Sequence, residues 1–294
     1  MFRHCLICTD FSDGLQRLAR FVPDLAAGGL KRIVFSHSVP LWEEGGIPRI
    51  DEEGMQAARD RLESQLNVGD AEVEVIIEVP SGRPAETIPK LVNQYDIEVI
   101  ITGAPTRSLV KEKVFGSTTL ALAKATNIPL MVLRPQLVST YTQEELALRC
   151  RALWRYLLIP YNDGEAANYL LDTLKAYAQN AETRFPECCM LVWVISEVSR
   201  RGTDERTQYR LQQAHERLAA VKAELEAVGL TVNAEVRQGD TFTEITDAAL
   251  DFDISAIATS YVTRGAVLEL AAPSFANEVV RRSWFPVLFF SPES

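Results

Sequence analysis

Short apolar runs alternate with amphipathic stretches along the whole chain. In the first half, runs rich in Val, Ile and Leu predict the strands Cys5–Thr9, Ile33–Val39, Val73–Val79, Val99–Thr102 and Leu130–Leu133. Apolar residues at helical spacing between them predict the helices Asp13–Ala27, Glu52–Leu66, Pro84–Gln94 and Thr118–Thr126. Strands that alternate with helices favour parallel pairing and a sheet covered on both faces. The pattern therefore predicts an open α/β sandwich.

Two segments of this half carry local signals. Ser12 can cap the first predicted helix, and Pro23 can kink or shorten it. The stretch that holds Gly45, Gly46 and Pro48 is interpreted as a loop.

The second half repeats the same order of elements. Its predicted strands are Tyr156–Ile159, Met190–Ile195, Thr231–Val236, Ile254–Thr259 and Val287–Phe290. Its predicted helices are Glu165–Gln179, Asp204–Val228, Phe242–Leu250 and Phe275–Arg282. The order alone suggests that one domain occurs twice.

Residue identities support a duplication. Gly82 and Gly239 are 157 positions apart, and the same offset relates Asp96-Ile97 to Asp253-Ile254. Near the start of each half, CTDFS and PYNDG align at an offset of 152, so five extra residues enter the second half. The long helix predicted over Asp204–Val228 and its surroundings can absorb them.

We therefore expect a first domain over residues 1–137, a linker over 138–152 and a second domain over 153–294. Thr142 followed by Glu145 is a capping-box pattern, which favours a connecting helix over Thr142–Ala152. A solvated tether is the alternative for this linker.

Composition narrows the class of protein. The 294 residues suit two domains of about 150 residues each. The formal net charge of −10 argues against a nucleic-acid or anionic-membrane surface, because both need a basic footprint. The N-terminal apolar run is too short for a signal peptide, and no run approaches the roughly 18 residues that span a bilayer. We expect a cytoplasmic protein.

The five cysteines fit a reduced compartment better than a disulfide framework. Cys5 and Cys8 have C-x-x-C spacing but lie on a predicted strand, where positions i and i+3 point to opposite faces. Two small buried hydrophobic residues are therefore favoured over a redox or zinc pair.

The stretch from Val99 to Pro135 carries the candidate chemistry. A buried strand leads to Gly103, a basic loop holds Arg107, Lys111 and Lys113, and Gly116-Ser117 opens a helix. A glycine lets backbone amides approach a ligand, and a helix N-terminus supplies free N–H groups, so this combination suits a phosphate. The usual P-loop and the dinucleotide fingerprint G-x-G-x-x-G are absent.

The spacing Gly103-x2-Thr106-x9-Gly116-Ser117 resembles the G-x2-G-x9-G-[S/T] signature of the ATP-binding universal stress proteins. Three of the four marked positions match, and Thr106 stands where the family has its second glycine. The resemblance implies two tandem domains with mostly parallel five-stranded sheets, of the adenine nucleotide alpha hydrolase-like kind. It also implies a stress-response protein that binds ATP or a related adenine nucleotide, with or without Mg²⁺.

Carried over by position, the resemblance gives a set of binding residues. Asp10 would lie beside the adenosine part, and the phosphates would meet Gly103, Thr106, Gly116, Ser117 and Thr118. Val39, with His37, could border the base. Simpler interpretations stay open: Asp10 fits a turn or N-cap acid, Gly116-Ser117 an empty helix start, and the lysines a solvated loop.

The second half has different residues at most of the corresponding positions. Asn162 replaces the aspartate, Ser260 and Thr263 stand at the first two glycine positions, and Pro273 precedes Ser274. Because proline removes an amide donor, we expect no nucleotide there. In the resembled family, domains pair through their last strands, so Leu130–Leu133 and Val287–Phe290 would meet in an intramolecular pseudo-dimer, with a further homodimer as an option.

Evidence for catalysis is thin. His4, His37 and His215 form no H-E-x2-H pattern, and no G-x-S-x-G elbow occurs, so slow ATP hydrolysis is the most we expect. The first alternative is a scaffold that acts through protein association without nucleotide. The second, an adenylyl-transferring or ATP-pyrophosphatase enzyme, needs an HIGH-like or SGG-x-DS-like motif that TDFSDG does not supply.

Overall fold

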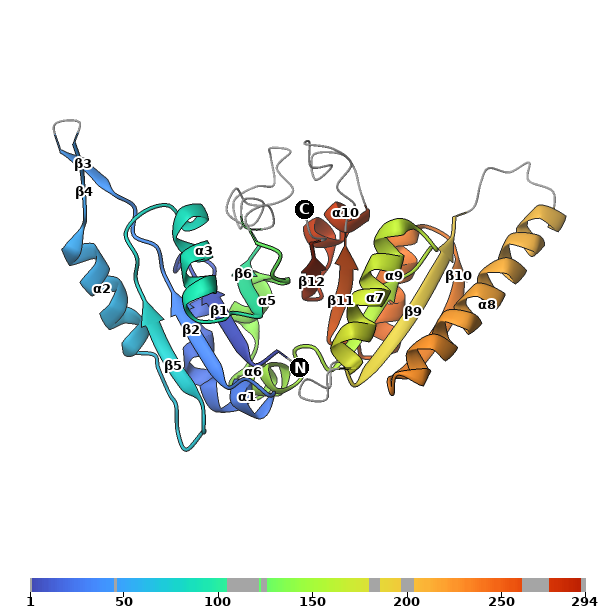
Figure 1. The fold of residues 1–294 in the computed structure, drawn as a ribbon, viewed down its shortest axis with the longest axis horizontal. Coiled ribbons are helices and arrows are strands. Elements are labelled where there is room, and N and C mark those ends of the chain that lie inside the picture. The colour runs from blue at the N-terminus through green and yellow to red at the C-terminus, as the bar shows by residue number, and fades with distance from the viewer. Residues whose placement is uncertain are drawn as a thin grey trace. The chain divides into compact units, whose positions relative to one another are not determined.

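The structure is a computed structural model that describes residues 2–44, 47–104, 122, 126–179, 186–196, 204–260 and 275–291. Residues Phe2–Ala152 and Leu153–Pro292 form two compact units. Both have an all-parallel five-stranded sheet with helices packed on it, as the alternating sequence pattern predicts (Figure 1).

The sheet of the N-terminal unit has the order β5-β2-β1-β6-β7. Its strands are β1 (His4–Cys8), β2 (Arg32–Ser36), β5 (Glu74–Glu78), β6 (Val99–Gly103) and β7 (Leu130–Leu133). Its helices are the 3-10 helix η1 (Leu15–Phe21), α1 (Val22–Ala27), α2 (Glu52–Glu63), α3 (Pro84–Gln94), α5 (Pro135–Thr140) and α6 (Gln143–Arg151). Strands β1 and β6 lie at its centre and are almost fully buried.

The sheet of the C-terminal unit has the equivalent order β10-β9-β8-β11-β12. Its strands are β8 (Tyr156–Pro160), β9 (Cys188–Ile195), β10 (Thr231–Gln238), β11 (Ala256–Ser260) and β12 (Val287–Phe290). Its helices are α7 (Glu165–Gln179), α8 (Asp204–Ala227), α9 (Thr241–Asp251) and α10 (Phe275–Arg282). Lys175 of α7 pairs with Glu224 of α8 at 2.6 Å, which places these two helices side by side.

The strand register supports the duplication at the level of single residues. Cys5 pairs with Val99 in the first sheet, and Leu157 pairs with Ala256 in the second. Backbone conformation agrees, because the residues with positive φ recur at matching places. The matching pairs are Phe11 and Asp163 (62° and 57°), Asp96 and Asp253 (51° each), and Gly82 and Gly239 (124° and 148°).

The register also locates the five extra residues, and it corrects the expectation that the long helix α8 takes them. Cys5 pairs with Ile33, and Leu157 pairs with Cys189, so the offset has already grown from 152 to 156 at the second strand. Four of the five residues therefore enter between β8 and β9. Helix α7 has 15 residues and covers this interval, whereas η1 and α1 cover it in the first unit.

The helix predicted over Asp13–Ala27 is wrong in its first part. Gly14 has a left-handed backbone (φ 72°), and a 3-10 helix follows over Leu15–Phe21 before the α-helix begins at Val22. Ser12 is no cap, because its N–H and hydroxyl both donate to Asp10. Pro23 stands in the first turn of α1, where its fixed φ is tolerated.

The loop predicted around Gly45 and Gly46 contains a hairpin. Strands β3 (Trp42–Glu44) and β4 (Ile47–Arg49) pair antiparallel and extend beyond the sheet of their unit (Figure 1). Pro48 opposes Glu43 in the ladder, whereas Gly45 and Gly46, which come between the two strands in the sequence, lie outside the described residues. A two-glycine connection is a strong hairpin signal, but proline in the second run argues against a strand.

The expected capping box at the linker is present. Thr142 accepts from the N–H of Glu145, and the Glu145 side chain accepts from the N–H of Thr142. Helix α6 packs against α1, and Arg151 forms an ion pair with Asp24 at 2.7 Å. The segment is therefore a helix held to the N-terminal unit, which decides against the solvated tether.

Candidate functional site

The centre of the candidate site lies where the strand order of the N-terminal sheet reverses. From β1 the chain builds outward through β2 and β5 on one side, and β6 and β7 lie on the other. In open α/β sheets, ligands bind beyond the carboxyl ends of the strands at this switch point. Cys8 and Gly103 end the two strands that meet there.

Asp10 follows β1 and organises the loop after it. Its Oδ1 accepts from the N–H and hydroxyl of Ser12, both at 2.8 Å, and from the N–H of Asp13 at 3.1 Å. This is an Asx turn. The residue is exposed, so the turn presents a carboxylate at the switch point. The interpretation of Asp10 as a turn acid is correct, and it leaves the ligand interpretation open.

Asp13, which the sequence interpretation did not include among the site residues, is the buried acid of this loop. Its side chain accepts from the Thr9 hydroxyl at 2.7 Å, the Leu15 N–H at 2.9 Å and the Asp10 N–H at 3.3 Å. Burial raises the pKa of the Asp13 carboxyl, and the hydrogen bonds from Thr9 and Leu15 partly oppose this. An acid three residues after another one, in a turn that follows a strand, is the only sequence signal for it.

Gly103 lies against this aspartate. A Cβ atom added at Gly103 would come 2.7 Å from the Asp13 Cβ and 3.1 Å from its Oδ2. Real Cβ atoms essentially never come that close, so the position cannot take a side chain without movement. Among the predicted binding residues, the structure thus brings Asp10 and Gly103 close together, because Asp13 of the β1 loop contacts both of them.

Phe11 and His37 form a second part of the same edge. Phe11 has a left-handed backbone (φ 62°), which is uncommon outside glycine, and its ring centroid lies 4.3 Å from that of His37. His37 Nδ1 donates to the Thr9 carbonyl oxygen at 2.9 Å. The Arg61 guanidinium from α2 lies 4.2 Å from the centre of the Phe11 ring. A cation and two rings in contact, tilted by 32° to each other, therefore adjoin the β1 loop.

Val39 lies in the apolar core against which Phe11 packs. Its side chain, 5% exposed, belongs to a cluster with Ala58 and Val79, against which Phe11 packs. Its N–H donates to the Pro80 carbonyl at 2.9 Å, and its carbonyl accepts from the Gly82 N–H at 2.8 Å. The main-chain groups of Val39 are thus already engaged, and a contact with a base stays a prediction.

The remaining predicted site residues lie outside the part of the chain that the structure describes. These are Thr106, Gly116, Ser117 and Thr118, together with the basic residues Arg107, Lys111 and Lys113. Thr263, Pro273 and Ser274 of the second half lie outside it as well. The phosphate part of the site therefore stays a prediction from the sequence.

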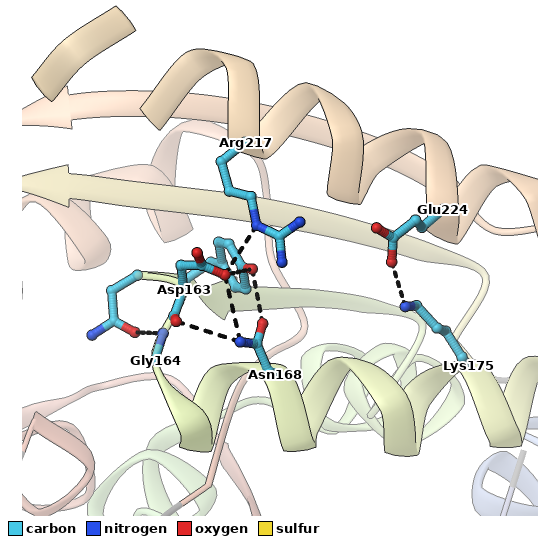
Figure 2. Close-up of polar contacts among 8 residues, drawn as sticks. Asp163, Gly164, Asn168, Lys175, Arg217 and Glu224 are labelled. Atoms are coloured by element: carbon cyan, nitrogen blue, oxygen red, sulfur yellow. Dashed lines mark hydrogen bonds and ion pairs between the residues drawn. The ribbon is translucent and has the colours of Figure 1, made fainter. Parts of the chain in front are cut away.

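The C-terminal unit fills the equivalent place with its own side chains. Tyr161, 2% exposed, holds its hydroxyl 2.8 Å from Asp163 Oδ1 and 2.8 Å from Asn168 Oδ1. Arg217 of α8 binds the same Asp163 oxygen at 2.9 Å, as Figure 2 shows. Burial and the bond to Asp163 raise the pKa of Tyr161 to about 12, and the Tyr161 and Arg217 contacts lower that of Asp163.

These side chains correspond to those of the first unit. The Thr9 N–H donates to the Ser36 carbonyl, and the Tyr161 N–H donates to the Val192 carbonyl. Ser36 and Val192 are therefore equivalent, and so are the residues that follow them, His37 and Trp193. Arg217 stands 156 positions after Arg61, and each arginine reaches the residue with positive φ in its own unit. Both pairs are 156 positions apart. The sequence comparison used offsets of 152 and 157, so it did not align them.

The two cysteines of β1, Cys5 and Cys8, are free thiols. Burial raises the pKa of the Cys5 thiol well above its usual value and that of Cys8 to about 12. Within the described ranges, no group of three or more His, Cys, Asp or Glu side chains could hold a metal ion. No helix in these ranges is both long and apolar enough to cross a membrane.

Comparison with known proteins decides the family. The sequence matches the universal stress protein family over residues 1–134 and again over 154–291. The chain belongs to that family. The two matches also support the tandem form of this universal stress protein, with one copy of the fold in each unit. No curated protein matches the chain in sequence.

Solved structures agree with the fold of this universal stress protein. One is a universal stress protein from Archaeoglobus fulgidus DSM 4304, with 18% identity, 98% of each chain covered and a TM-score of 0.62. Another, of unknown function, comes from Pseudomonas aeruginosa PAO1, with 13% identity, 99% of this chain and 93% of that chain covered, and a TM-score of 0.56. A putative universal stress protein from Pseudomonas aeruginosa UCBPP-PA14 covers 98% of this chain and 93% of that one, with 15% identity and a TM-score of 0.55.

Proposed function

We propose that the N-terminal unit binds ATP or a related adenine nucleotide, and that the C-terminal unit binds none. The protein would act in a stress response as a regulator: the bound nucleotide would change the predicted loop Ala104–Phe115 and so alter contacts with a protein partner. The proposal extends the family assignment and the spacing of Gly103, Gly116 and Ser117.

One observation carries the proposal. The exposed Asp10 carboxylate and Gly103 lie together at the switch point, where open α/β sheets bind ligands. A carboxylate there can accept hydrogen bonds from ribose hydroxyls or from an exocyclic amine, which are donors that a nucleoside offers. It would repel phosphates, so these belong on the other side of Gly103, toward the predicted basic loop.

The asymmetry between the units supports a single site. In the C-terminal unit, Asp163 is bound by Tyr161 and Arg217, and Ser260 carries a side chain where the first unit has Gly103. The hydroxyl of Ser260 donates to the Ala166 carbonyl at 2.8 Å. A nucleotide placed there as in the first unit would have to break these contacts.

Thermal unfolding of the full chain with ATP, ADP, AMP or a cyclic nucleotide tests the proposal. A ligand at 100 times its Kd stabilises the native state by about 2.7 kcal/mol, which raises Tm by roughly 5 to 10 °C for a domain of this size. Each nucleotide is measured with Mg²⁺ and with EDTA, which shows whether the metal contributes. If none of them shifts Tm, the proposal is wrong.

Association without nucleotide is the second candidate, and the β3–β4 hairpin favours it. Trp42 is 47% exposed and Ile47 is 63% exposed, and both stand on a hairpin that extends beyond its sheet. Exposed apolar side chains that gather in one place often mark a contact surface. The test is the mass of the protein in solution. Association alone is the better account if this mass is the same with and without ATP and falls in the double variant Trp42→Ser/Ile47→Ser.

A further inference from the structure

Gly103, at the end of β6, lies directly against the side chain of Asp13 in the loop after β1. The Cα of Gly103 faces the Asp13 side chain so closely that a Cβ would lie 2.7 Å from the Asp13 Cβ. Asp13 is only 7% exposed. The sequence interpretation assigned the glycine to an approaching ligand, but within the described residues its open side is taken by a side chain of the same unit.

The same aspartate also holds the loop that carries Asp10. Asp13 Oδ2 accepts from the Asp10 N–H at 3.3 Å, and Asp10 Oδ1 accepts from the Asp13 N–H at 3.1 Å. Asp13 Oδ1 accepts from the Thr9 hydroxyl and the Leu15 N–H, so the side chain is fixed from both directions along the chain. One carboxylate therefore links the loop after β1 to the point where the chain leaves β6.

The second copy of the fold changes both positions at once. By the strand offsets, Glu165 corresponds to Asp13 and Ser260 to Gly103. Glu165 is exposed at the start of α7, and the Ser260 hydroxyl donates instead to the carbonyl of Ala166, the next residue. A side chain at the glycine position thus occurs together with an acid that has turned out to solvent.

We propose that Asp13 is a positioning residue of the nucleotide site, matched to Gly103. Gly103 lacks a side chain because Asp13 needs the space, and the contact sets Asp10 and the first residue of the predicted phosphate loop at a fixed separation. The expected effect on ATP binding rests on the proposed nucleotide function. The steric match of Gly103 with Asp13 does not, because the two residues fit together without ligand.

A set of variants of the full chain separates this account from a glycine that serves the ligand directly. Gly103→Ala is made in three backgrounds: wild type, Asp13→Gly and Asp13→Ala. Asp13→Gly removes the Cβ that would clash, whereas Asp13→Ala keeps it and removes only the carboxylate. Tm is measured without ligand, and the ATP Kd is measured by calorimetry well below the lowest Tm, where every variant is folded.

We expect Gly103→Ala to lower Tm by roughly 5 °C in the wild-type and Asp13→Ala backgrounds and by less than half of that in Asp13→Gly. The ATP Kd should rise at least about tenfold with Gly103→Ala alone and recover partly in the Asp13→Gly background. If Gly103→Ala does not fold in the wild-type background, recovery of folded protein with Asp13→Gly supports the pairing equally.

An equal loss of Tm in all three backgrounds overturns the pairing. If Gly103→Ala lowers Tm less in the Asp13→Gly background than in wild type, but the ATP Kd does not change in any variant, the positioning role is overturned. If wild-type protein binds no nucleotide, the proposed function and the positioning role both fail, whereas the Tm values still decide whether Gly103 and Asp13 are matched.

Discussion

Asp10 and Asn162 make the same turn in the two units. Asp10 Oδ1 accepts from the Ser12 N–H at 2.8 Å, and Asn162 Oδ1 accepts from the Gly164 N–H at 3.0 Å. In each unit the next residue along the chain, Phe11 or Asp163, has a left-handed backbone. The turn therefore needs a side-chain oxygen at this position but no negative charge.

This equivalence separates the two roles of Asp10. Asp10→Asn keeps the oxygen that the turn uses, so we expect Tm to change by less than about 2 °C. It removes the charge, and because hydrogen bonds to charged groups contribute about 1.5–3 kcal/mol, the ATP Kd should rise roughly tenfold or more. Calorimetry and thermal unfolding measure the two effects separately. An unchanged Kd would mean that Asp10 serves the turn alone.

The predicted phosphate segment has its own internal control. Gly116→Pro gives the first copy the residue that the second has at Pro273, and it removes one amide donor. Gly116→Ala keeps that donor. We expect ATP affinity to fall at least about tenfold with proline and to change much less with alanine. Equal losses would show that the amide of residue 116 does not bind the phosphates.

The polar network of the C-terminal unit should stabilise that unit. Tyr161→Phe removes a buried hydroxyl that lies 2.8 Å from Asp163 and Asn168, so we expect a loss of about 1 kcal/mol, or roughly 3 °C in Tm. Tyr209→Phe is the matched control, because Tyr209 is 62% exposed on α8 and should change stability by less than about 0.5 kcal/mol. Denaturant unfolding that finds the two variants equal would contradict the role of the network.

Asp13 should give the stability of the chain a measurable pH dependence. Burial raises the pKa of its carboxyl in the native state above the ordinary aspartate value of 3.8. The native state then binds the proton more tightly than the unfolded state, so this contribution is complete below pH 3.8 and is lost as pH rises through the native pKa. Compared with Asp13→Asn, wild type should therefore lose relative stability as pH rises above about 4. A difference that is constant or grows with pH would contradict the raised pKa.

Much of the fold was predictable because local signals agreed with the tertiary structure. Helix Pro84–Gln94 has proline in its first turn, and strand Leu130–Leu133 is apolar throughout, so both have the predicted bounds. The first helix was mistaken because apolar residues at spacings of three and four suit α and 3-10 helices alike, and the structure has a 3-10 helix over Leu15–Phe21. The β3–β4 hairpin was missed because Gly45, Gly46 and Pro48 were all interpreted as loop residues, and its strands are only three residues long.

The candidate site was less predictable, because it depends on contacts between distant segments. Asp10 and Gly103 could be named from their places after apolar strands. Asp13 could not, since its importance comes from the approach of β6, 90 positions away in the sequence. The correspondence of Arg61 with Arg217 needed the strand register, because an insertion hides it from a comparison at constant offset.

Native mass spectrometry of the full chain with ATP tests the central claim most directly, because it counts bound nucleotides. The account predicts one nucleotide for each chain at saturation, and a lower occupancy for the Gly116→Pro variant than for wild type at an ATP concentration near the wild-type Kd. A wild-type chain that retains no nucleotide, or one that retains two, would contradict it.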